Sequence, residues 1–223
     1  IDFKDGYRVA RALTTDEVYK MVDKFKASVE RAVKAGFDAI EIHGAHGYLI
    51  HQFHSNILNN REDEFGKDKT KFGCDVIKAA KSVMPEDMPL IIRISASEFA
   101  KGGYDISYGV KLAEAYKNAG ADIIHVSSGG EGPIDEDKKP KIFAGYQVGF
   151  AKEIKDKVNV DVIAVGILED PELANYIIES NQADLVAVGR GMFKNPYWPI
   201  ETALKLGMKT EIPKQYERGI RFK

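Results

Sequence analysis

The sequence from residue 119 to 127 reads Ala119-Gly120-Ala121-Asp122-Ile123-Ile124-His125-Val126-Ser127. It predicts the end of a helix, a turn and a strand in immediate succession. Glycine is a natural residue to end a helix because it adopts the left-handed backbone conformation without strain. The run that follows is rich in Ile and Val and short enough to be a buried strand of a parallel sheet. Its carboxyl end carries polar residues.

The same junction recurs at Ala35–Asp38 and, without the glycine, at Gln182–Asp184. Five short apolar runs of this kind predict strands at residues 38–43, 90–95, 122–127, 161–166 and 184–189. Helical spacing of apolar residues predicts helices at residues 18–33, 74–83, 108–118, 147–157, 171–180 and 196–206. Thr15-Asp16-Glu17 is the expected cap region of the first helix, and Pro171 and Pro196 suit first-turn positions.

Strands that alternate with helices indicate an α/β fold with a parallel sheet. Polar residues stand at successive strand ends, as in a (β/α)8 TIM barrel, whose active site lies at that face. No Gly-x-Gly-x-x-Gly follows a first strand, which disfavours a doubly wound dinucleotide fold. A whole barrel needs eight strands, over roughly 250 residues. We therefore expect residues 1–223 to form a single, partial barrel domain with about five recognisable βα units. The start at Ile1 rather than Met favours a processed chain or a fragment.

Composition excludes several classes of protein. Lys and Arg number 32 against 34 Asp and Glu, so the basic excess typical of nucleic-acid binders is lacking. No apolar run approaches the ~18 residues of a membrane-spanning helix. Cys74 is the single cysteine, which rules out an internal disulfide or a cysteine-held iron–sulfur cluster. A reducing, cytoplasmic location is the simplest interpretation.

Four of the five histidines fall between His43 and His54. A metal site is disfavoured because no Asp or Glu lies among them and because the glycine turn aims the first pair differently from the second. For His51 and His54 a structural, hydrogen-bonded role near a surface turn is favoured. The third interpretation places His43 and His46 at the pocket rim, where two N–H groups would stabilise one substrate oxygen. Tyr48 would then be placed to donate a proton, because a phenol is protonated at neutral pH.

Gly189 and Arg190 follow the last predicted strand, and Gly166 follows the strand before it. Loops after the last two strands of a barrel commonly bind phosphate, where glycine lets backbone N–H groups approach and arginine adds a cationic donor. These glycines could also serve only as tight turns, but a phosphate site is favoured.

Arg93 stands between two isoleucines inside a predicted strand. A buried arginine is costly unless it is paired or faces a ligand. Two alternatives follow: contact with the electron-rich edge of a cofactor ring, or an ion pair with Glu41 on the adjacent strand.

Together these residues resemble the flavin-dependent old yellow enzyme family, FMN barrels that reduce activated alkenes with a nicotinamide. The resemblance runs from about residue 14 to Gly219 and is most specific over Ala35–Phe53 and Asn60–Gly66. Shorter matches are Ile92–Ser97, Val126–Gly129, Gly145–Gln147, Val188–Arg190 and Tyr216–Gly219, the last similar to the bacterial, thermophilic-like branch. The first three strands of the family barrel have no counterpart.

The resemblance implies that His43 and His46 bind the carbonyl oxygen of an α,β-unsaturated substrate and that Tyr48 donates a proton or contacts the substrate. It further implies that Arg93 contacts the flavin ring, that Ser128 and Gly129 lie in a matching cofactor-binding stretch, and that Gly189 and Arg190 bind the FMN phosphate. NADH or NADPH would be the reductant. Arg218 lies in a tail that reaches a neighbouring subunit in the similar branch, which implies a homo-oligomer.

Two rival hypotheses remain. A phosphate-binding barrel isomerase or aldolase without flavin explains Gly189 and Arg190 but leaves the stretch from His43 to Tyr48 unexplained. An inactive barrel fragment, acting as a scaffold or as half of an assembly, fits the missing front strands. Two unpaired strand edges of an open barrel would favour self-association.

Overall fold

The computed structural model describes residues 11–130 and 134–219. Five parallel strands form one sheet in the order β1-β2-β3-β4-β5. They span Ile40–Gly44 (β1), Leu90–Ser95 (β2), Ile123–Ser127 (β3), Asp161–Val165 (β4) and Leu185–Ala187 (β5). Each strand therefore pairs with its neighbour in sequence. A doubly wound sheet reverses its strand order, whereas a barrel wall does not, so the sheet is a segment of a barrel.

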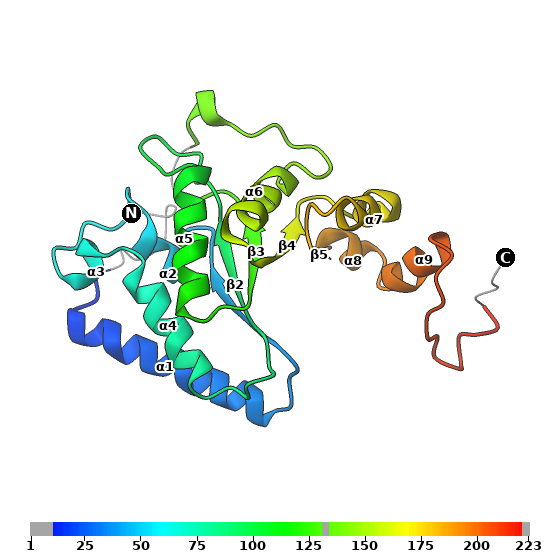
Figure 1. Cartoon of the computed structure of the whole chain (residues 1–223), viewed down its shortest axis with the longest axis horizontal. Helices are drawn as coiled ribbons and strands as arrows, with labels where there is room; N and C mark the ends of the chain where they lie inside the picture. The colour runs from blue at the N-terminus through cyan, green and yellow to red at the C-terminus, as the bar shows by residue number, and fades with distance from the viewer. Residues whose placement is uncertain (1–10, 131–133, 220–223) are drawn as a thin grey trace.

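The principal helices lie on one side of the sheet; the first precedes β1 and the other four lie between consecutive strands (Figure 1). They are α1 (Thr15–Lys34), α4 (Lys71–Lys81), α5 (Ile106–Ala119), α6 (Val148–Val158) and α7 (Pro171–Glu179). Shorter segments are α2 (Leu49–His54), α3 (Glu64–Lys67), η1 (Glu136–Lys138), α8 (Arg190–Lys194) and α9 (Trp198–Lys205). Neighbouring helices α4, α5 and α6 pack on one another as well as on the strands. After α9 the chain runs away from the sheet (Figure 1).

The two faces of the sheet differ in chemistry. Ile42, Ile92 and Ile124 are buried and belong to the core between sheet and helices. Because side chains alternate along a strand, the residues next to them lie on the opposite face. That face carries Glu41 and His43 on β1, and Arg93 and Ser95 on β2, with His125 and Ser127 continuing it on β3. The alternation therefore produces an apolar outer face and an inner face whose polar side chains, on β2 and β3, gather toward the carboxyl ends of the strands.

The five predicted strands and the long predicted helices are confirmed, with shifts of a few residues at their ends. The cap of α1 lies one residue earlier than expected: Thr14 accepts from the Glu17 N–H, and the Glu17 carboxylate accepts from the Thr14 N–H. Pro171 begins α7 as predicted. The prediction for Pro196 is wrong, because it precedes α9 and Pro199 takes the first-turn position.

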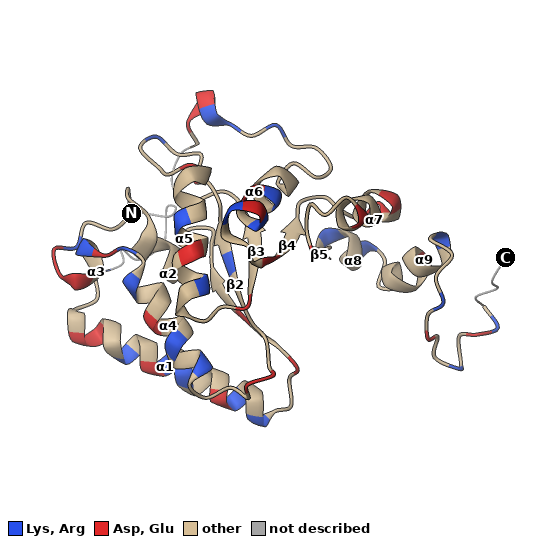
Figure 2. Ribbon diagram, in the orientation of Figure 1, with Lys and Arg blue, Asp and Glu red and all other residues tan. Residues whose placement is uncertain are grey.

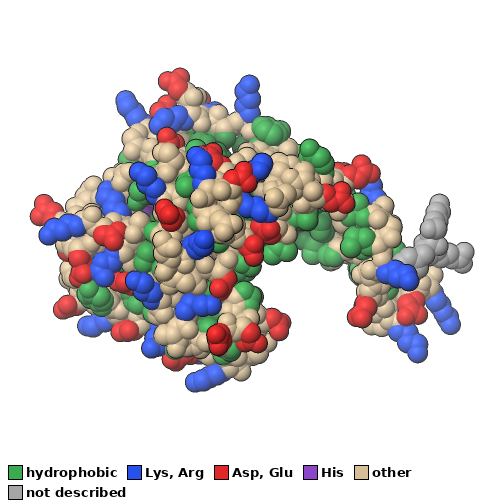
Figure 3. All heavy atoms as spheres, in the orientation of Figure 1, with side chains coloured by type: hydrophobic (Ala, Val, Ile, Leu, Met, Phe, Trp, Pro, Cys, Tyr) green, Lys and Arg blue, Asp and Glu red, His purple; other side chains and the backbone are tan. Residues whose placement is uncertain are grey.

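Charged side chains of both signs are intermixed along the helices (Figure 2). Apolar side chains gather on the concave side between the main body and the segment that carries α8 and α9 (Figure 3). Exposed large apolar residues of this part of the chain include Leu185, Phe193 and Tyr197. Among the described residues, no helix combines the length and the apolarity needed to cross a membrane.

Two helical glycines provide a test of the packing. A Cβ at Gly73 in α4 would lie 2.3 Å from the hydroxyl of Tyr116, whose ring is fully buried, whereas a Cβ at Gly149 in α6 would meet nothing within 4 Å. We expect Gly73→Ala to lower the free energy of unfolding by about 1–3 kcal/mol, because a buried aromatic ring cannot move aside. Gly149→Ala should raise it by about 0.5–1 kcal/mol through helix propensity.

Urea unfolding followed by circular dichroism measures both changes. Equal effects of the two substitutions would contradict the packing of α4 against α5.

Candidate functional site

A pocket of about 290 Å³ opens at the carboxyl ends of the strands. Six of the nine predicted site residues line it: His46, Arg93, Ser128, Gly166, Gly189 and Arg190. The structure adds residues to which no role was assigned from the sequence: Ser127, Tyr146, Gln147, Val165, Ile167, Leu168, Glu169, Ala187 and Val188. Because parallel strands end at one edge, segments more than a hundred residues apart in sequence share this pocket.

Three predicted residues lie outside that lining. The ring of His43 is 5.4 Å from the ring of His46 and 5.4 Å from the ring of Tyr48, centroid to centroid. The three side chains therefore form one group, of which His46 faces the pocket. Tyr48 precedes α2 and is 64% exposed. Gly129 is engaged through its backbone, donating to Ser97 O and accepting from Ser95 Oγ.

The turn after β1 positions the group. His46 has a φ of 58°, in the left-handed region, and Gly47 has a φ of 77°. Histidine is one of the few side chains found there with some frequency, and such strain persists only where neighbours hold it. The His46 N–H donates to Ser95 Oγ at 3.1 Å, and that hydroxyl donates to Gly129 O at 2.5 Å. Ser95 thus ties the histidine turn to the loop that follows β3.

Burial lowers the pKa of both histidines, and the positive charge of Arg93 lowers it further. The pKa of His46 falls to about 4. At neutral pH the His46 imidazole is therefore uncharged, and it carries a single N–H.

Arg93 does not pair with Glu41. The Glu41 carboxylate is hydrogen-bonded to His125 Nδ1 at 2.6 Å, and no described residue accepts from the buried Nε of Arg93. A buried donor without a partner is costly, and a ligand commonly satisfies it. The ion-pair alternative for Arg93 is therefore not the arrangement seen, and its guanidinium faces the pocket.

The loops after β4 and β5 also line the pocket. Gly166 has a φ of 132°, and a Cβ there would lie 3.0 Å from Gln147 Nε2. A Cβ at Gly189 would meet nothing within 4 Å, so its neighbours do not require glycine. Arg190 is exposed beside it. Arg190 and the unpaired Nε of Arg93 suit an anionic, electron-rich ligand such as FMN. Glu169, which also lines the pocket, is paired with Lys194 at 3.3 Å.

His51 and His54 have a structural role, as predicted, but their expected place near a surface turn is wrong. Both are fully buried. His51 Nε2 is 2.9 Å from Glu98 Oε1, and His54 bridges the hydroxyls of Tyr116 and Tyr104 at 2.9 and 3.2 Å. They fasten α2 to the segments after β2. Within the described ranges, no three His, Cys, Asp or Glu residues are grouped so as to hold a metal ion.

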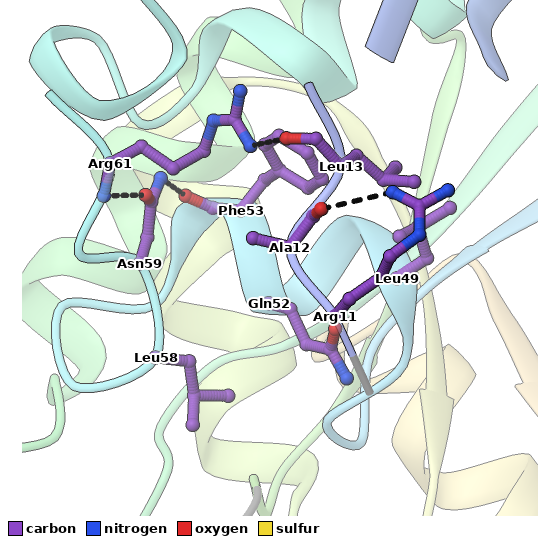
Figure 4. Close-up of a pocket in the computed structure, with 9 residues that line it drawn as sticks. All are labelled: Arg11, Ala12, Leu13, Leu49, Gln52, Phe53, Leu58, Asn59 and Arg61. Atoms are coloured by element: carbon purple, nitrogen blue, oxygen red, sulfur yellow. Dashed lines mark hydrogen bonds between the residues drawn. The ribbon is translucent and has the colours of Figure 1, made fainter. Parts of the chain in front are cut away.

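A second pocket, of about 160 Å³, lies where the segment before α1 meets the chain after α2 (Figure 4). Its polar side chains bond backbone N–H or carbonyl groups, or the carboxylates of Glu17 and Asp63. Arg61 Nη1 donates to Leu13 O at 2.5 Å, and Asn59 Nδ2 donates to Phe53 O at 2.5 Å (Figure 4). None of the predicted site residues lines it, so it is a structural joint rather than a second candidate site.

Residues 2–209 match the model of the NADH:flavin oxidoreductase / NADH oxidase family. The chain belongs to this family. FMN with a nicotinamide reductant is the cofactor chemistry of the family, as the resemblance implied. The chain is 39% identical over 222 residues to an NADPH dehydrogenase of Clostridium acetobutylicum and 40% identical over 225 residues to one of Geobacillus thermodenitrificans. The two matches span 97% and 100% of this chain, but this chain spans 64% of the length of each relative.

Solved structures confirm the fold. A 2-naphthoyl-CoA reductase complex matches with a TM-score of 0.79 at 18% identity, over 89% of this chain and 31% of that one. Histamine dehydrogenase from Rhizobium sp. 4-9 matches with a TM-score of 0.75 at 22% identity, over 89% of this chain and 29% of that one. The partial barrel of the family member described here thus superposes on part of larger oxidoreductases.

The depressed pKa of His46 makes stability depend on acidity. A histidine in the unfolded chain titrates near pH 6.5, whereas His46 in the folded chain titrates near pH 4. Between these two values the unfolded chain therefore binds a proton at His46 that the folded chain does not bind. The free energy of unfolding should therefore fall as the pH falls through this window. Between pH 6.5 and 4 we expect the free energy of unfolding of His46→Asn to fall by about 1 kcal/mol less than that of the wild type. The difference is small because the ring is partly exposed to solvent.

Urea unfolding at pH 6.5 and pH 4 measures the difference between the two proteins. If the free energy of unfolding falls equally in both proteins between pH 6.5 and pH 4, the depressed pKa of His46 is contradicted.

Proposed function

We propose that this chain is the flavin-binding part of an FMN-dependent oxidoreductase that reduces the activated C=C bond of α,β-unsaturated carbonyl compounds. The observation that carries the proposal is the buried, unpaired Nε of Arg93, which belongs to a residue that lines one pocket with Gly166, Gly189 and Arg190. An arginine aimed at a ring and a glycine–arginine loop suited to phosphate match the two ends of FMN.

In this proposal Arg93 contacts the electron-rich edge of the flavin ring. Ser128, Gly129 and Gly166 flank the cofactor, and Gly189 and Arg190 bind its phosphate. Five of these six residues line one pocket; the sixth, Gly129, lies in the loop that Ser95 ties to the histidine turn. Residues 1–223 then act as a single flavin-binding unit.

When bound, FMN supplies the redox chemistry, accepting hydride from NADH or NADPH and delivering it to the β-carbon of the substrate. His43 and His46 hold the substrate oxygen, and their neighbouring rings stabilise the negative charge that develops on it. The hydroxyl of Tyr48, which the structure leaves exposed beside His43, donates the proton to the α-carbon.

We also propose that the chain self-associates. In the described residues β1 pairs only with β2, and β5 only with β4, so each has one unpaired edge. Arg218, in the tail after α9, lies in the segment proposed to reach a neighbouring copy.

Flavin retention tests the proposal. After incubation with FMN and desalting, the chain should keep a visible flavin absorption band. Arg190→Ala should weaken FMN binding by about tenfold, because a charge-assisted bond to phosphate is lost. Arg31→Ala, which removes an arginine from the exposed side of α1, is the matched control and should bind FMN like the wild type. A cooperatively folded chain that retains no flavin would overturn the proposal and favour an inactive fragment.

Phenol binding tests the histidine pair. In the FMN-loaded chain, a phenol held beside the flavin should produce a long-wavelength charge-transfer band. The double variant His43→Ala/His46→Ala should lose that band while it keeps the flavin band, since neither histidine is proposed to hold FMN. Unchanged phenol binding in the double variant would remove the pair from the site.

A further inference from the structure

Gln147 stands at the centre of a hydrogen-bond chain that ends on His46. It precedes α6, and its side chain is almost fully buried against the pocket. Its amide nitrogen donates to Val165 O at 2.9 Å. Its amide oxygen accepts from Ser128 Oγ at 2.5 Å and from Ser127 Oγ at 3.3 Å. Ser127 Oγ in turn lies 2.8 Å from His46 Nε2.

The carbonyl of Val165 decides the orientation of this amide. A backbone carbonyl only accepts hydrogen bonds, so the group that faces it must be the NH₂ of Gln147. The oxygen of Gln147 consequently faces the two serines. An amide oxygen has no proton to give, so in each of these two hydrogen bonds the serine hydroxyl is the donor.

The hydroxyl of Ser127 has a single proton, which is then committed to Gln147. Toward His46 it can only accept, so the proton of the shared hydrogen bond belongs to His46 Nε2. A neutral imidazole carries one N–H, which leaves Nδ1 as a bare lone pair. No described residue donates to Nδ1 of His46 in the chain. Ser95 holds the backbone of His46, and the hydrogen bond of Nε2 to Ser127 Oγ holds its ring.

We infer that Gln147 is a positioning residue that, through Ser127, fixes His46 in the Nε2–H tautomer and leaves its Nδ1 as a hydrogen-bond acceptor. The effect of this tautomer on binding of the substrate oxygen rests on the proposed function. The ring centroid of His46 lies 5.4 Å from that of His43, so the histidine pair then includes one acceptor nitrogen, His46 Nδ1. An oxygen that carries a proton, such as the hydroxyl of a phenol or an enol, matches this arrangement directly. A carbonyl oxygen requires the His46 proton to leave Ser127, and Gln147 sets how unfavourable that exchange is.

The tautomer can be observed without flavin or substrate. In the 223-residue chain labelled with ¹⁵N-histidine, long-range ¹H–¹⁵N correlation at neutral pH distinguishes the protonated from the unprotonated ring nitrogen. The signals missing from His46→Asn identify His46. We expect Nε2 to carry the proton, and a dominant Nδ1–H form in the wild type would overturn the inference. Because no cofactor is present, a failure to bind FMN cannot produce either result.

Two substitutions test the causal chain. Gln147→Leu removes the acceptor of the Ser127 proton, which frees that hydroxyl to donate to His46, and Ser127→Ala removes the acceptor of the His46 proton. Each should shift the tautomer ratio toward Nδ1–H by about fivefold, the equilibrium effect of one ordinary hydrogen bond. Gln182→Leu makes the same replacement at a side chain that bonds only Ser180 in the described chain, and should leave the ratio unchanged.

An unchanged ratio in either test variant would overturn the role of Gln147. Ser127→Ala removes one atom from a strand residue, so it provides the test even if Gln147→Leu does not fold, which circular dichroism would show.

Discussion

Three parallel strands hold His43, Arg93 and His125 in one row, because the register pairs each of these residues with the next. The same register pairs Ser95 with Ser127 two residues further along. Since side chains alternate, every one of these polar groups lies on the face that the helices leave open. The apolar residues between them hold the sheet to α4, α5 and α6. Folding of the core and presentation of the site thus depend on a single register.

Polar groups on that inner face are paired selectively. Glu41 is hydrogen-bonded to His125. Ser95 bonds the backbone of His46 and of Gly129, and Ser127 bonds the side chains of His46 and Gln147. Arg93 is left with an unsatisfied buried N–H at the pocket. Such a donor is tolerated where a ligand completes it. Nε2 of His125 is also buried without a partner on this face, but of the two residues only Arg93 lines the pocket. Arg93 is therefore the unpaired group best placed to meet a cofactor.

Local signals in the chain predict most of the architecture. Gly120 ends α5 with a φ of 115°, as its place before a strand indicates, and Pro171 begins α7. Errors occurred where two candidates for one local role stood close together, as with Thr14 against Thr15 and Pro199 against Pro196. The prediction that His51 and His54 lie near the surface was wrong because their partners Glu98, Tyr104 and Tyr116 are 47 or more positions away.

The sequence alone determined the order of strands and helices and the side chains that stand at the strand ends, because periodicity, caps and turns act over a few residues. It also predicted site residues in the segment from His43 to Tyr48 and in the Gly189–Arg190 loop. Only the tertiary structure decided which partner each of these groups takes. Gln147 begins a helix rather than ending a strand, so it reaches His46 only through Ser127, 20 positions from Gln147 and 81 from His46. Hydrogen bonds are short and directional, and their partners are known only once the sheet has brought distant segments together.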